Sequence, residues 1–436
     1  MAAPLNVGII GFGNIGAGVL RALKANEEVI NARLPHPIRI VRIADLDTTR
    51  RRDAEFDPAI LSNDSAALIE DPNIHVVIEL TGAMEPARVL IEKALKAGKH
   101  VVTANKALLA THGMELIRTA VASKVCLLFE GAVGGGIPLI RTLHQGLAAN
   151  SIEAVRGIIN GTANYILTEM TERGVDFETA LAEAQRRGYA EPDPTYDVEG
   201  HDTAHKLAIL ATLCFGQDIR FDDIPREGIT KIQSIDIAFA RELGYTIKLL
   251  GIARRHEDGS VEVRVHPTML PSQSRLASVN GVYNAVRFDG NLTGSIILSG
   301  RGAGPEPTAS AVISDLMALA SGKAEGGLRR EMRLCMADQK KNLRPMDQLV
   351  SRYCLRFGIL DCPGAMAQVL KALGDNEVSV ASIKQPFRQD PKKGFAHILV
   401  VTHEAHESQV RSAVAEIPKL EVSRTEPFVL RIEDMG

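Results

Sequence analysis

The chain has 436 residues, and at about 150 residues per domain this length suggests about three folded units. Its composition is 45% hydrophobic and 24% charged with a net charge of -3, which is typical of an ordinary soluble protein. A charge so close to zero provides no overall field for nucleic acid or for an anionic membrane. Tryptophan is absent and only 12 Phe and 6 Tyr are present, so a base-stacking surface is not expected.

Cysteine usage and the N-terminus indicate a reducing compartment. The five cysteines are an odd number without a CxxC pair, which excludes the usual zinc modules and fits free thiols. No stretch approaches about 18 uninterrupted apolar residues. Met1–Pro4 has neither a basic region nor a cleavage site. We therefore expect a cytoplasmic protein that binds neither nucleic acid nor a membrane.

Residues 1–150 alternate short apolar strands with helical segments. Parallel strands joined by crossover helices produce this alternation, so we expect a Rossmann-type, doubly wound α/β domain. One helix, Glu85–Ala97, is followed by Gly98 at the position where glycine commonly ends helices. The expected strands are Leu5–Ile10, Ile38–Ala44, Val76–Leu80, His100–Thr103 and Val125–Phe129.

Residues 151–325 mix both element types without regular alternation, which favours an α+β domain with a sheet backed by helices. After the flexible turn Gly300–Gly304, the helix Pro307–Ala320 is expected to pack back on the first domain, so that residues 306–321 complete it. The other expected elements are the helices Asp176–Arg187 and Asp202–Phe215 and the strands Tyr245–Ala253, Val261–Val265 and Ser295–Leu298.

Residues 323–344 are rich in Lys and Arg but contain no aromatic residue, so a solvated linker over 326–347 is favoured over a nucleic-acid contact. Residues 348–436 then show the order βαββαβ, which is the ferredoxin-like arrangement. The expected strands are Arg352–Leu360, Val378–Lys384, Phe395–Thr402 and Phe428–Ile432, and the expected helices are Gly364–Leu373 and Glu407–Ala415.

The segment GFGNIG, residues 11–16, follows the first strand and opens a helix. Gly11 permits a tight turn, Gly13 lets the backbone approach a pyrophosphate, and Gly16 allows close helix–strand packing. The phosphates would lie at the helix N-terminus, where free N–H groups and the dipole favour negative charge. A glycine turn that merely packs closely is the alternative, but the strand before and the βαβ continuation favour dinucleotide binding.

Cofactor preference stays open. Asp45 ends the second strand, where a carboxylate would bind a ribose 2′-OH and favour NAD, whereas the nearby Arg50–Arg52 would suit the 2′-phosphate of NADP. Asp45 lies further from Gly16 than is usual, because Asn26–Pro37 has the composition of an inserted loop.

The segment Gly188–Gly200 is an acidic loop that leads into a helix beginning near His201. Asp202 and Lys206 are four residues apart and share a face of that helix, where the carboxylate would set the proton affinity of the ammonium, as hydride transfer to a carbonyl requires. An ordinary surface ion pair is the alternative. The loop carboxylates, Glu191, Asp193 and Asp197, would grip an ammonium group of a substrate.

Three further patterns carry chemistry. His201 and His205, with an acid between them, have the spacing of zinc peptidases, but the acid is Asp and no third ligand follows. Lys106 follows the fourth strand, at the edge where open α/β sheets bind ligands, although a surface lysine that starts a helix fits equally. Glu130 precedes the glycine-rich run Gly131–Pro138, which would bind a hard cation or simply form a tight turn.

Together these motifs resemble homoserine dehydrogenase, which interconverts aspartate semialdehyde and homoserine with a nicotinamide cofactor. They occur in family order over about 320 residues, and the segment 188–206 is the most specific. The motifs are GFGNIG at 11–16, TANKALLA at 103–110, EGAVGGGIP at 130–138, INGTANYIL at 159–167, GYAEPDPTYDVEGHDTAHK at 188–206 and GRGAGPEPTASAV at 300–312.

The resemblance implies roles for individual residues. Lys206 would exchange the proton at the carbonyl oxygen, with Asp202 and Lys106 beside it, and Glu191 and Asp202 would hold homoserine with support from Asp197. The two histidines have no part in that chemistry. The implied cofactor residues are Gly11, Gly13, Asn14, Ile15, Gly16, Asp45, Thr81, Lys106, Gly188 and Gly304. The implied sodium ligands, mostly through backbone carbonyls, are Glu130, Val133, Gly135 and Ile137.

The C-terminal segment resembles an ACT regulatory domain. Its first strand–helix turn, where an amino acid typically binds, contains Asp361, Pro363, Gly364 and Ala365. The resemblance implies that threonine inhibits the enzyme by binding across paired ACT domains of a homodimer or homotetramer. It also implies a role in threonine, methionine and isoleucine biosynthesis. We expect a monofunctional form, because no kinase segment precedes Gly11. A purely structural ferredoxin-like module is the alternative.

Two other functions compete with this interpretation. A dehydrogenase for a different amino-acid semialdehyde would keep the fold and change the substrate. A sensor that binds nicotinamide and an amino acid without catalysis would need no acid–base pair, so Asp202 and Lys206 argue against it.

Overall fold

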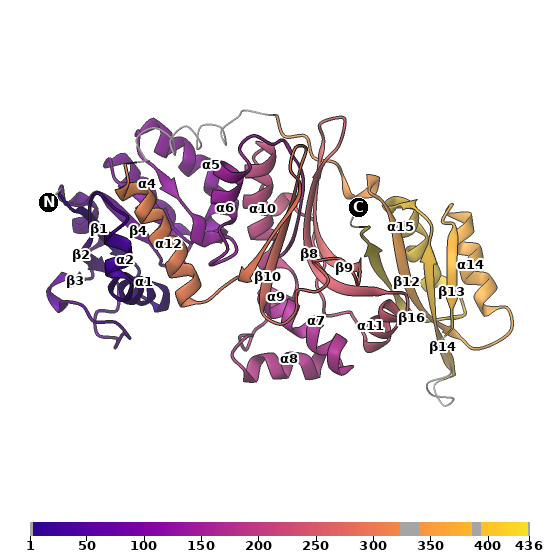
Figure 1. Cartoon of the computed structure of the whole chain (residues 1–436). Helices are drawn as coiled ribbons and strands as arrows, with labels where there is room; N and C mark the ends of the chain where they lie inside the picture. Colours follow the sequence, from indigo (N-terminus) through magenta and orange to yellow (C-terminus); the bar gives the residue numbers. More distant parts are fainter. Residues whose placement is uncertain (1–2, 323–339, 386–393, 435–436) are drawn as a thin grey trace.

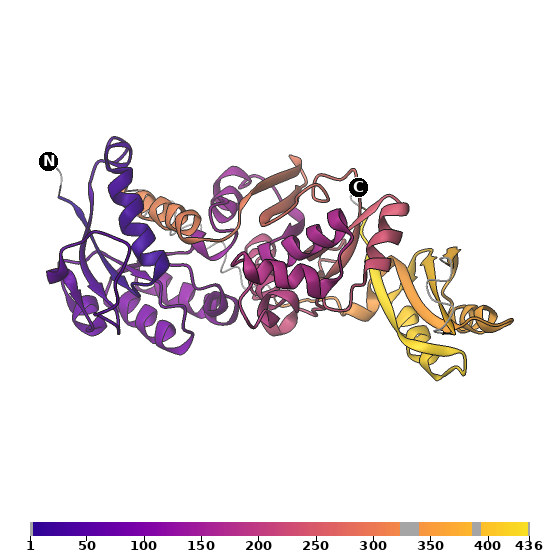
Figure 2. The same ribbon diagram turned by 90° about the horizontal axis from the view of Figure 1, so that it is seen from below.

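The computed structural model describes residues 3–322, 340–385 and 394–434. Most of the basic connector, and much of the linker expected at 326–347, therefore lies outside the described residues. Figures 1 and 2 show an elongated arrangement, with the N-terminal sheet at one end and the C-terminal strands at the other. Among the described residues, no helix is both long enough and apolar enough to cross a membrane.

The N-terminal part is a parallel six-stranded sheet with the order β3-β2-β1-β4-β5-β6. The chain winds outward from β1 in one direction and then from β4 in the other, so the switch point between β1 and β4 is the expected ligand crevice. The strands are β1 (Leu5–Ile10), β2 (Ile38–Ala44), β3 (Leu61–Ser62), β4 (Val76–Glu79), β5 (His100–Thr103) and β6 (Leu127–Leu128).

Helices cover this sheet and connect its strands. They are α1 (Asn14–Ala25), α2 (Glu27–Asn31), α3 (Ser65–Glu70), α4 (Glu85–Lys96), α5 (Lys106–Ala122) and the much later α12 (Pro305–Ala320). Both views place α12 alongside α1 (Figures 1 and 2). A side chain at Gly18 of α1 would stand 3.1 Å from the carbonyl oxygen of Pro305, so the absence of a side chain at Gly18 permits this close packing.

The middle part contributes five antiparallel strands to a second sheet, whose order begins β11-β10-β7-β8-β9. Helix α10 packs against β7, β8 and β9, and α7 and α11 pack against β8. The strands are β7 (Ile152–Ile158), β8 (Tyr245–Arg255), β9 (Val261–Pro271), β10 (Tyr283–Gly290) and β11 (Gly294–Arg301). The main helices are α7 (Gly161–Arg173), α8 (Phe177–Arg186), α9 (Thr195–Val198), α10 (His201–Phe215) and α11 (Ser234–Glu242).

The C-terminal part has the order β12, α14, β13, β14, α15, β16, with β15 as a short addition. Its main strands are antiparallel in the order β16-β12-β14-β13, so the predicted ferredoxin-like βαββαβ topology is confirmed, as is the fold class as a whole. The elements are β12 (Val350–Leu360), α14 (Ala365–Asp375), β13 (Val380–Lys384), β14 (Phe395–Thr402), β15 (Ala405–His406), α15 (Glu407–Glu416) and β16 (Ser423–Ile432).

The two parts of the second sheet are continuous, which the sequence did not indicate. β16 pairs in parallel with β9 through only two residue pairs, Arg431 with Thr268 and Ile432 with Met269. The result is a single ten-stranded sheet that extends from β11 to β13. Because so few backbone pairs join the parts, side chains must supply much of the contact between them.

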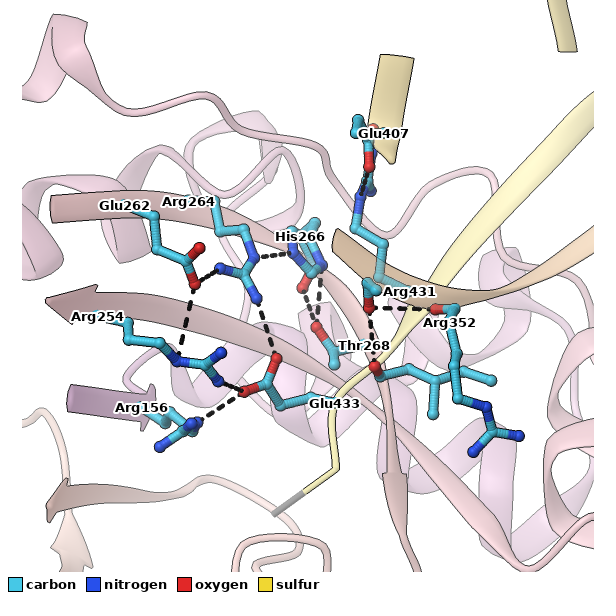
Figure 3. A network of polar contacts seen from close by, with 12 residues as sticks. Arg156, Arg254, Glu262, Arg264, His266, Thr268, Arg352, Glu407, Arg431 and Glu433 are labelled. Atoms are coloured by element: carbon cyan, nitrogen blue, oxygen red, sulfur yellow. Dashed lines mark hydrogen bonds and ion pairs between the residues drawn. The ribbon is translucent and has the colours of Figure 1, made fainter. Parts of the chain in front are cut away.

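A buried network of ion pairs lies at this junction (Figure 3). Glu433, which directly follows β16, accepts hydrogen bonds from arginines on three neighbouring strands. These are Arg156 on β7 at 2.8 Å, Arg254 on β8 at 2.7 Å and Arg264 on β9 at 3.0 Å. Arg431 of β16 contacts Glu407 of α15 and donates to both carboxylate oxygens of Glu227 at 2.8 Å. These ion pairs hold Arg431 and Glu433 against the middle part of the chain.

Several local expectations were wrong in extent. The segment Asn26–Pro37 is not only a loop, because the helix α2 forms within it. The fifth expected strand is reduced to Leu127–Leu128, and the strand expected at Val261–Val265 continues to Pro271. β7, α7 and β10 were not predicted. In β9, ten of the eleven residues are buried, and some of them carry the charged side chains of the junction. These charged residues interrupt the hydrophobic pattern by which a strand is recognised in a sequence.

Candidate active site

Helix α10 places a carboxylate and an ammonium in the interior of the middle part. Gly200 precedes the helix with φ 80°, a left-handed conformation that favours glycine. Asp202 and Lys206 lie one turn apart, and their residues are only 2% and 6% exposed. Lys206 Nζ donates to Asp202 Oδ2 at 2.7 Å and to the main-chain oxygen of Ile159 at 2.7 Å. This is therefore a buried pair and not a surface pair.

Lys106 joins the same carboxylate from the N-terminal part. Its Nζ lies 2.5 Å from Asp202 Oδ1, and its side chain is 35% exposed. Lys106 is the first residue of α5, which packs against α10 (Figure 1). Asn105 caps this helix by accepting from Leu108 N at 3.2 Å, and it donates to the carbonyl oxygen of Ala83 at 2.7 Å. The cluster therefore spans the two parts of the chain.

Asn160 organises the acidic side of the cluster, and sequence reasoning missed it. Its Oδ1 accepts from Ala163 N at 2.7 Å and so caps α7. Its Nδ2 donates to Asp197 Oδ1 at 2.7 Å and to Asp202 Oδ2 at 2.8 Å, which uses both amide protons. The available signal was an asparagine directly before the helix in INGTANYIL.

Burial and charge set the protonation of these groups. Burial lowers the pKa of Lys206, and the neighbouring Asp202 opposes this effect. Burial alone would raise the pKa of Asp202, but the two ammonium groups hold it well below its usual value. Burial also lowers the pKa of Lys106, but Asp202 outweighs this and leaves that pKa raised. The pKa of Asp197 is raised, chiefly by burial.

Tyr196 forms a wall of the site, which sequence reasoning also missed. Lys106 Nζ lies 5.4 Å from the centre of its ring, and burial raises the pKa of Tyr196 to about 12. Its hydroxyl lies 2.9 Å from His205 Nδ1, and His205 stacks on Phe221. The phenol ring therefore lies against the ammonium group of Lys106 and is itself held by its aromatic neighbours.

The histidine pair faces groups that do not suit a metal. Arg226 Nε donates to His201 Nδ1 at 2.9 Å, so a guanidinium occupies the position where a cation would bind. His205 Nδ1 already lies 2.9 Å from the main-chain oxygen of His201. In residues 3–322, 340–385 and 394–434, no three His, Cys, Asp or Glu side chains are grouped so as to hold a metal ion.

The loop carboxylates do not all converge on the cluster. Asp197 lies beside Asn160, but Glu191 and Asp193 are exposed. Asp193 accepts from Thr195 N at 3.1 Å within its own turn, so the expectation that all three acids grip one substrate group stays a prediction. Glu191 is exposed, and its main-chain oxygen accepts from Gln185 Nε2 at 3.2 Å.

A cavity of about 770 Å³ opens at the carboxyl ends of β1, β2 and β4. Gly11, Gly13, Asp45 and Thr81 line it, as the sequence predicts for a dinucleotide site. Ala83 also lines it and accepts from Asn105, the residue before Lys106, so the cavity adjoins the ion-pair cluster. Among the other predicted cofactor residues, Asn14, Ile15 and Gly16 form the first turn of α1. Lys106, Gly188 and Gly304 lie outside its described lining.

Each glycine of the turn over residues 11–16 is favoured for a different structural reason. Gly11 has φ 93°, and a Cβ there would lie 2.6 Å from the backbone of Leu80 and Thr81. A Cβ at Gly16 would lie 2.8 Å from the oxygen of Gly11. A Cβ at Gly13 would meet no atom within 4 Å, because Gly13 borders the open cavity. The turn thus has the close packing and the open approach that a pyrophosphate requires.

The segment Glu130–Ile137 is a turn stabilised by its acid. The carboxylate of Glu130 accepts from Ile140 N at 3.0 Å and from Arg141 N at 2.9 Å, so it caps the next helical turn. Gly134 and Gly135 are left-handed, and a Cβ at Gly135 would lie 2.7 Å from the backbone of Gly302. The carboxylate of Glu130 is thus engaged within the protein, so any hard cation at this segment would have to bind main-chain oxygens.

The β12–α14 turn of the C-terminal part holds the predicted effector residues. Gly364 has φ 83° and precedes α14, while Ala365 is buried beneath the turn. Asp361 and Pro363 are exposed. The turn thus presents its polar residues outward and anchors the helix with a small apolar one.

Comparison with known proteins agrees with this geometry. The family model "Homoserine dehydrogenase" matches residues 138–317, and "Homoserine dehydrogenase, NAD binding domain" matches residues 11–130. Homoserine dehydrogenases of Pseudomonas aeruginosa and Neisseria gonorrhoeae are 42% and 40% identical to the chain, and each alignment covers at least 99% of both proteins. The crystal structure of a homoserine dehydrogenase from Thiobacillus denitrificans has a TM-score of 0.90 at 40% identity, with 99% of each chain covered. The chain therefore belongs to the homoserine dehydrogenase family of oxidoreductases, which act on a CH–OH group.

Proposed function

We propose that the chain catalyses NAD(P)-dependent interconversion of L-homoserine and L-aspartate 4-semialdehyde, with Lys206 as the group that exchanges the substrate proton. The observation that carries this proposal is the buried carboxylate of Asp202 between Lys206 and Lys106, beside the cavity lined by Gly11 and Gly13. A dinucleotide bound in that cavity supplies the hydride acceptor or donor.

Lys206 has the geometry of a proton-exchanging group. Within the described residues, Ile159 O and Asp202 Oδ2 accept from its Nζ, which leaves one of three ammonium protons for a substrate oxygen. In the reducing direction Lys206 donates this proton to the carbonyl oxygen. In the oxidising direction it accepts the hydroxyl proton of homoserine. Its lowered pKa favours the neutral form that the second direction requires.

The remaining acids and the second lysine would position the substrate. Asp202 holds Lys206 in place and would contact homoserine together with Asp197, which Asn160 orients. Glu191, which is exposed, would hold homoserine together with Asp202. Lys106 would lie between the nicotinamide and the substrate, since it stands at the edge of the cluster nearest the cavity.

Further parts of the proposal concern assembly and regulation. We assign dinucleotide binding to residues 1–150 with α12, catalysis and dimerisation to 151–325, and an ACT-type effector site to 348–436, joined by the linker 326–347. Threonine would bind at Asp361–Ala365 and inhibit, within a cytoplasmic homodimer or homotetramer of threonine, methionine and isoleucine biosynthesis. Main-chain oxygens of Glu130, Val133, Gly135 and Ile137 would hold a structural sodium ion.

Initial-rate kinetics test the proposal directly. L-Homoserine should reduce NAD or NADP, and aspartate semialdehyde should consume the reduced cofactor, while other amino-acid semialdehydes react more slowly. Threonine should inhibit and raise the melting temperature. Faster turnover of another semialdehyde than of aspartate semialdehyde would overturn the substrate assignment. Tight dinucleotide binding without turnover would favour the sensor alternative.

A further inference from the structure

The segment 225–230 lies beside strand β9 and the start of α10. Glu227 N donates to Val265 O at 2.9 Å, and Val265 N donates to Pro225 O at 2.9 Å, so backbone hydrogen bonds fasten the segment to β9. Gly200, which precedes α10, lies against both, because a Cβ there would be 3.1 Å from Val265 Cγ1 and 3.7 Å from Glu227 O. The segment therefore follows the strand at the point where the active-site helix begins.

The same segment also holds α9, the short helix that carries Asp197. Ile229 N donates to Val198 O at 2.8 Å. A Cβ at Gly228 would lie 2.5 Å from Val198 O, so the chain approaches α9 this closely only because Gly228 has no side chain. Val198 directly follows Asp197, whose carboxylate accepts from Asn160 at 2.7 Å within the catalytic cluster. A shift of the segment would therefore be passed to Asp197.

The side chain of Glu227 ties the segment to the C-terminal part. Arg431 of β16 donates to both of its carboxylate oxygens, each at 2.8 Å, and such a two-point contact fixes the orientation of both groups. The side chain of Arg431 is only 3% exposed, and its Nε also donates to Glu407 of α15 at 2.9 Å (Figure 3). Arg431 thus stands between an acid of its own part and an acid of the middle part.

Glu433, two residues after Arg431, contacts a different region. It accepts from arginines of β7, β8 and β9, so it joins the C-terminal part to the sheet (Figure 3). Arg431 instead reaches the segment that packs on α9. The junction thus contains two separable ionic contacts, and the second of them leads to the residue beside Asp197.

We propose that Arg431 and Glu227 are positioning residues for the reaction, through which the C-terminal part holds Asp197 in the geometry that homoserine binding requires. The inference rests on the proposed function, in which Asp197 contacts the substrate. The dinucleotide cavity has no part in this link, since its described lining comes from residues 10–90 of the N-terminal part. Breaking the ion pair should therefore weaken homoserine binding and leave cofactor binding unchanged.

Glu227→Gln tests the link with little risk to folding. The amide keeps the shape of the side chain, which is 45% exposed, and Arg431 keeps the carboxylate of Glu407. The KM for homoserine should rise about fivefold or more, a typical size for coupling between distant sites, while kcat and the dinucleotide dissociation constant stay within about twofold of wild type. Glu227→Asp, which keeps the charge, should recover part of the homoserine affinity.

Glu433→Gln is the matched control at the same junction. It should lower the melting temperature while the KM for homoserine stays within about twofold of wild type. Hydrogen exchange followed by mass spectrometry adds a readout that does not depend on turnover. Glu227→Gln should speed exchange in peptides that cover 195–200 and 225–230, and Glu433→Gln should not.

An unchanged KM in Glu227→Gln would overturn the positioning role, and so would an equal rise in both variants, because a general loosening of the junction would then explain it. Exchange at the wild-type rate in Glu227→Gln would contradict the link itself. If the wild-type chain does not oxidise homoserine, the proposed function fails, and the exchange comparison still decides whether the C-terminal part holds the loop.

Discussion

Asp202→Asn replaces the one carboxylate that two ammonium groups share. In the native protein it contacts Lys206 at 2.7 Å, Lys106 at 2.5 Å and Asn160 at 2.8 Å, and the residue is 2% exposed. The amide keeps the shape of the side chain but removes the negative charge. Lys206, itself only 6% exposed, would then be a buried cation without its counter-charge.

The size of the effect follows from burial. Breaking a buried ion pair by neutralising one partner costs about 3–5 kcal/mol of unfolding free energy. The lower end, about 3 kcal/mol, is expected here, because Lys106 is 35% exposed and can turn to solvent, which leaves one stranded charge instead of two. Asn160 keeps its cap on α7, so the change should not melt the helix.

The loss should depend on pH in a definite direction. Without Asp202, burial lowers the pKa of Lys206 unopposed by its strongest partner. A lysine whose folded pKa is depressed destabilises the fold below its unfolded pKa of about 10.4, because the unfolded chain binds the proton more readily. The deficit relative to wild type is therefore largest near neutral pH and shrinks as pH rises toward that value. The pH profile of homoserine oxidation should shift to lower pH for the same reason.

Denaturant unfolding of both proteins at neutral and alkaline pH checks these expectations. Asp193→Asn is the matched control, because that exposed acid lies in the same loop and asparagine can keep its bond to Thr195 N. The control should stay within about 0.5 kcal/mol of wild type. A loss below about 1 kcal/mol for Asp202→Asn, or a deficit that does not vary with pH, would refute the buried-pair reasoning.

Three further outcomes follow from other contacts. Glu433→Gln should cost about 2–3 kcal/mol of unfolding free energy, because three arginines lose one charged acceptor. The loss is limited because Arg156 keeps its pair with Asp289 and Arg264 keeps its pair with Glu262. Thermal unfolding measures this loss, with the exposed neighbour changed in Asp434→Asn as the control. Gly11→Ala should abolish dinucleotide binding in a calorimetric titration, since a Cβ there would lie 2.6 Å from backbone atoms. Asn160→Ala should lower kcat by at least about tenfold with little change in cofactor affinity, and unchanged kinetics would remove its positioning role.

Local patterns in the sequence predicted the parts of the site that lie within one element. Asp202 and Lys206 share a helix face four residues apart, and the glycines of residues 11–16 follow a strand, so both features were visible in spacing alone. The contact of Lys106 with Asp202 was not, because it depends on how α5 packs against α10 across almost a hundred residues of sequence. Asn160 was hidden because a helix cap and a ligand of two carboxylates use the same residue type.

Side-chain orientation accounts for what the sequence left undecided. The sequence left open where Asp45 and Arg50–Arg52 point, and only the structure shows that Arg52 is buried against Phe12 while Arg51 lines another cavity. The continuous sheet escaped prediction because only two residue pairs join its parts, Arg431 with Thr268 and Ile432 with Met269. Such long-range pairings have no periodic signature along the chain.

The most direct test of the account is the turnover of Lys206→Ala in both directions with cofactor binding measured alongside. Removal of a proton-exchanging side chain should lower kcat by about 10²–10⁴ for homoserine oxidation and for semialdehyde reduction, while the dinucleotide dissociation constant stays close to wild type. Turnover within about a factor of ten of wild type, in a variant that is folded and binds cofactor, would contradict the central role of Lys206.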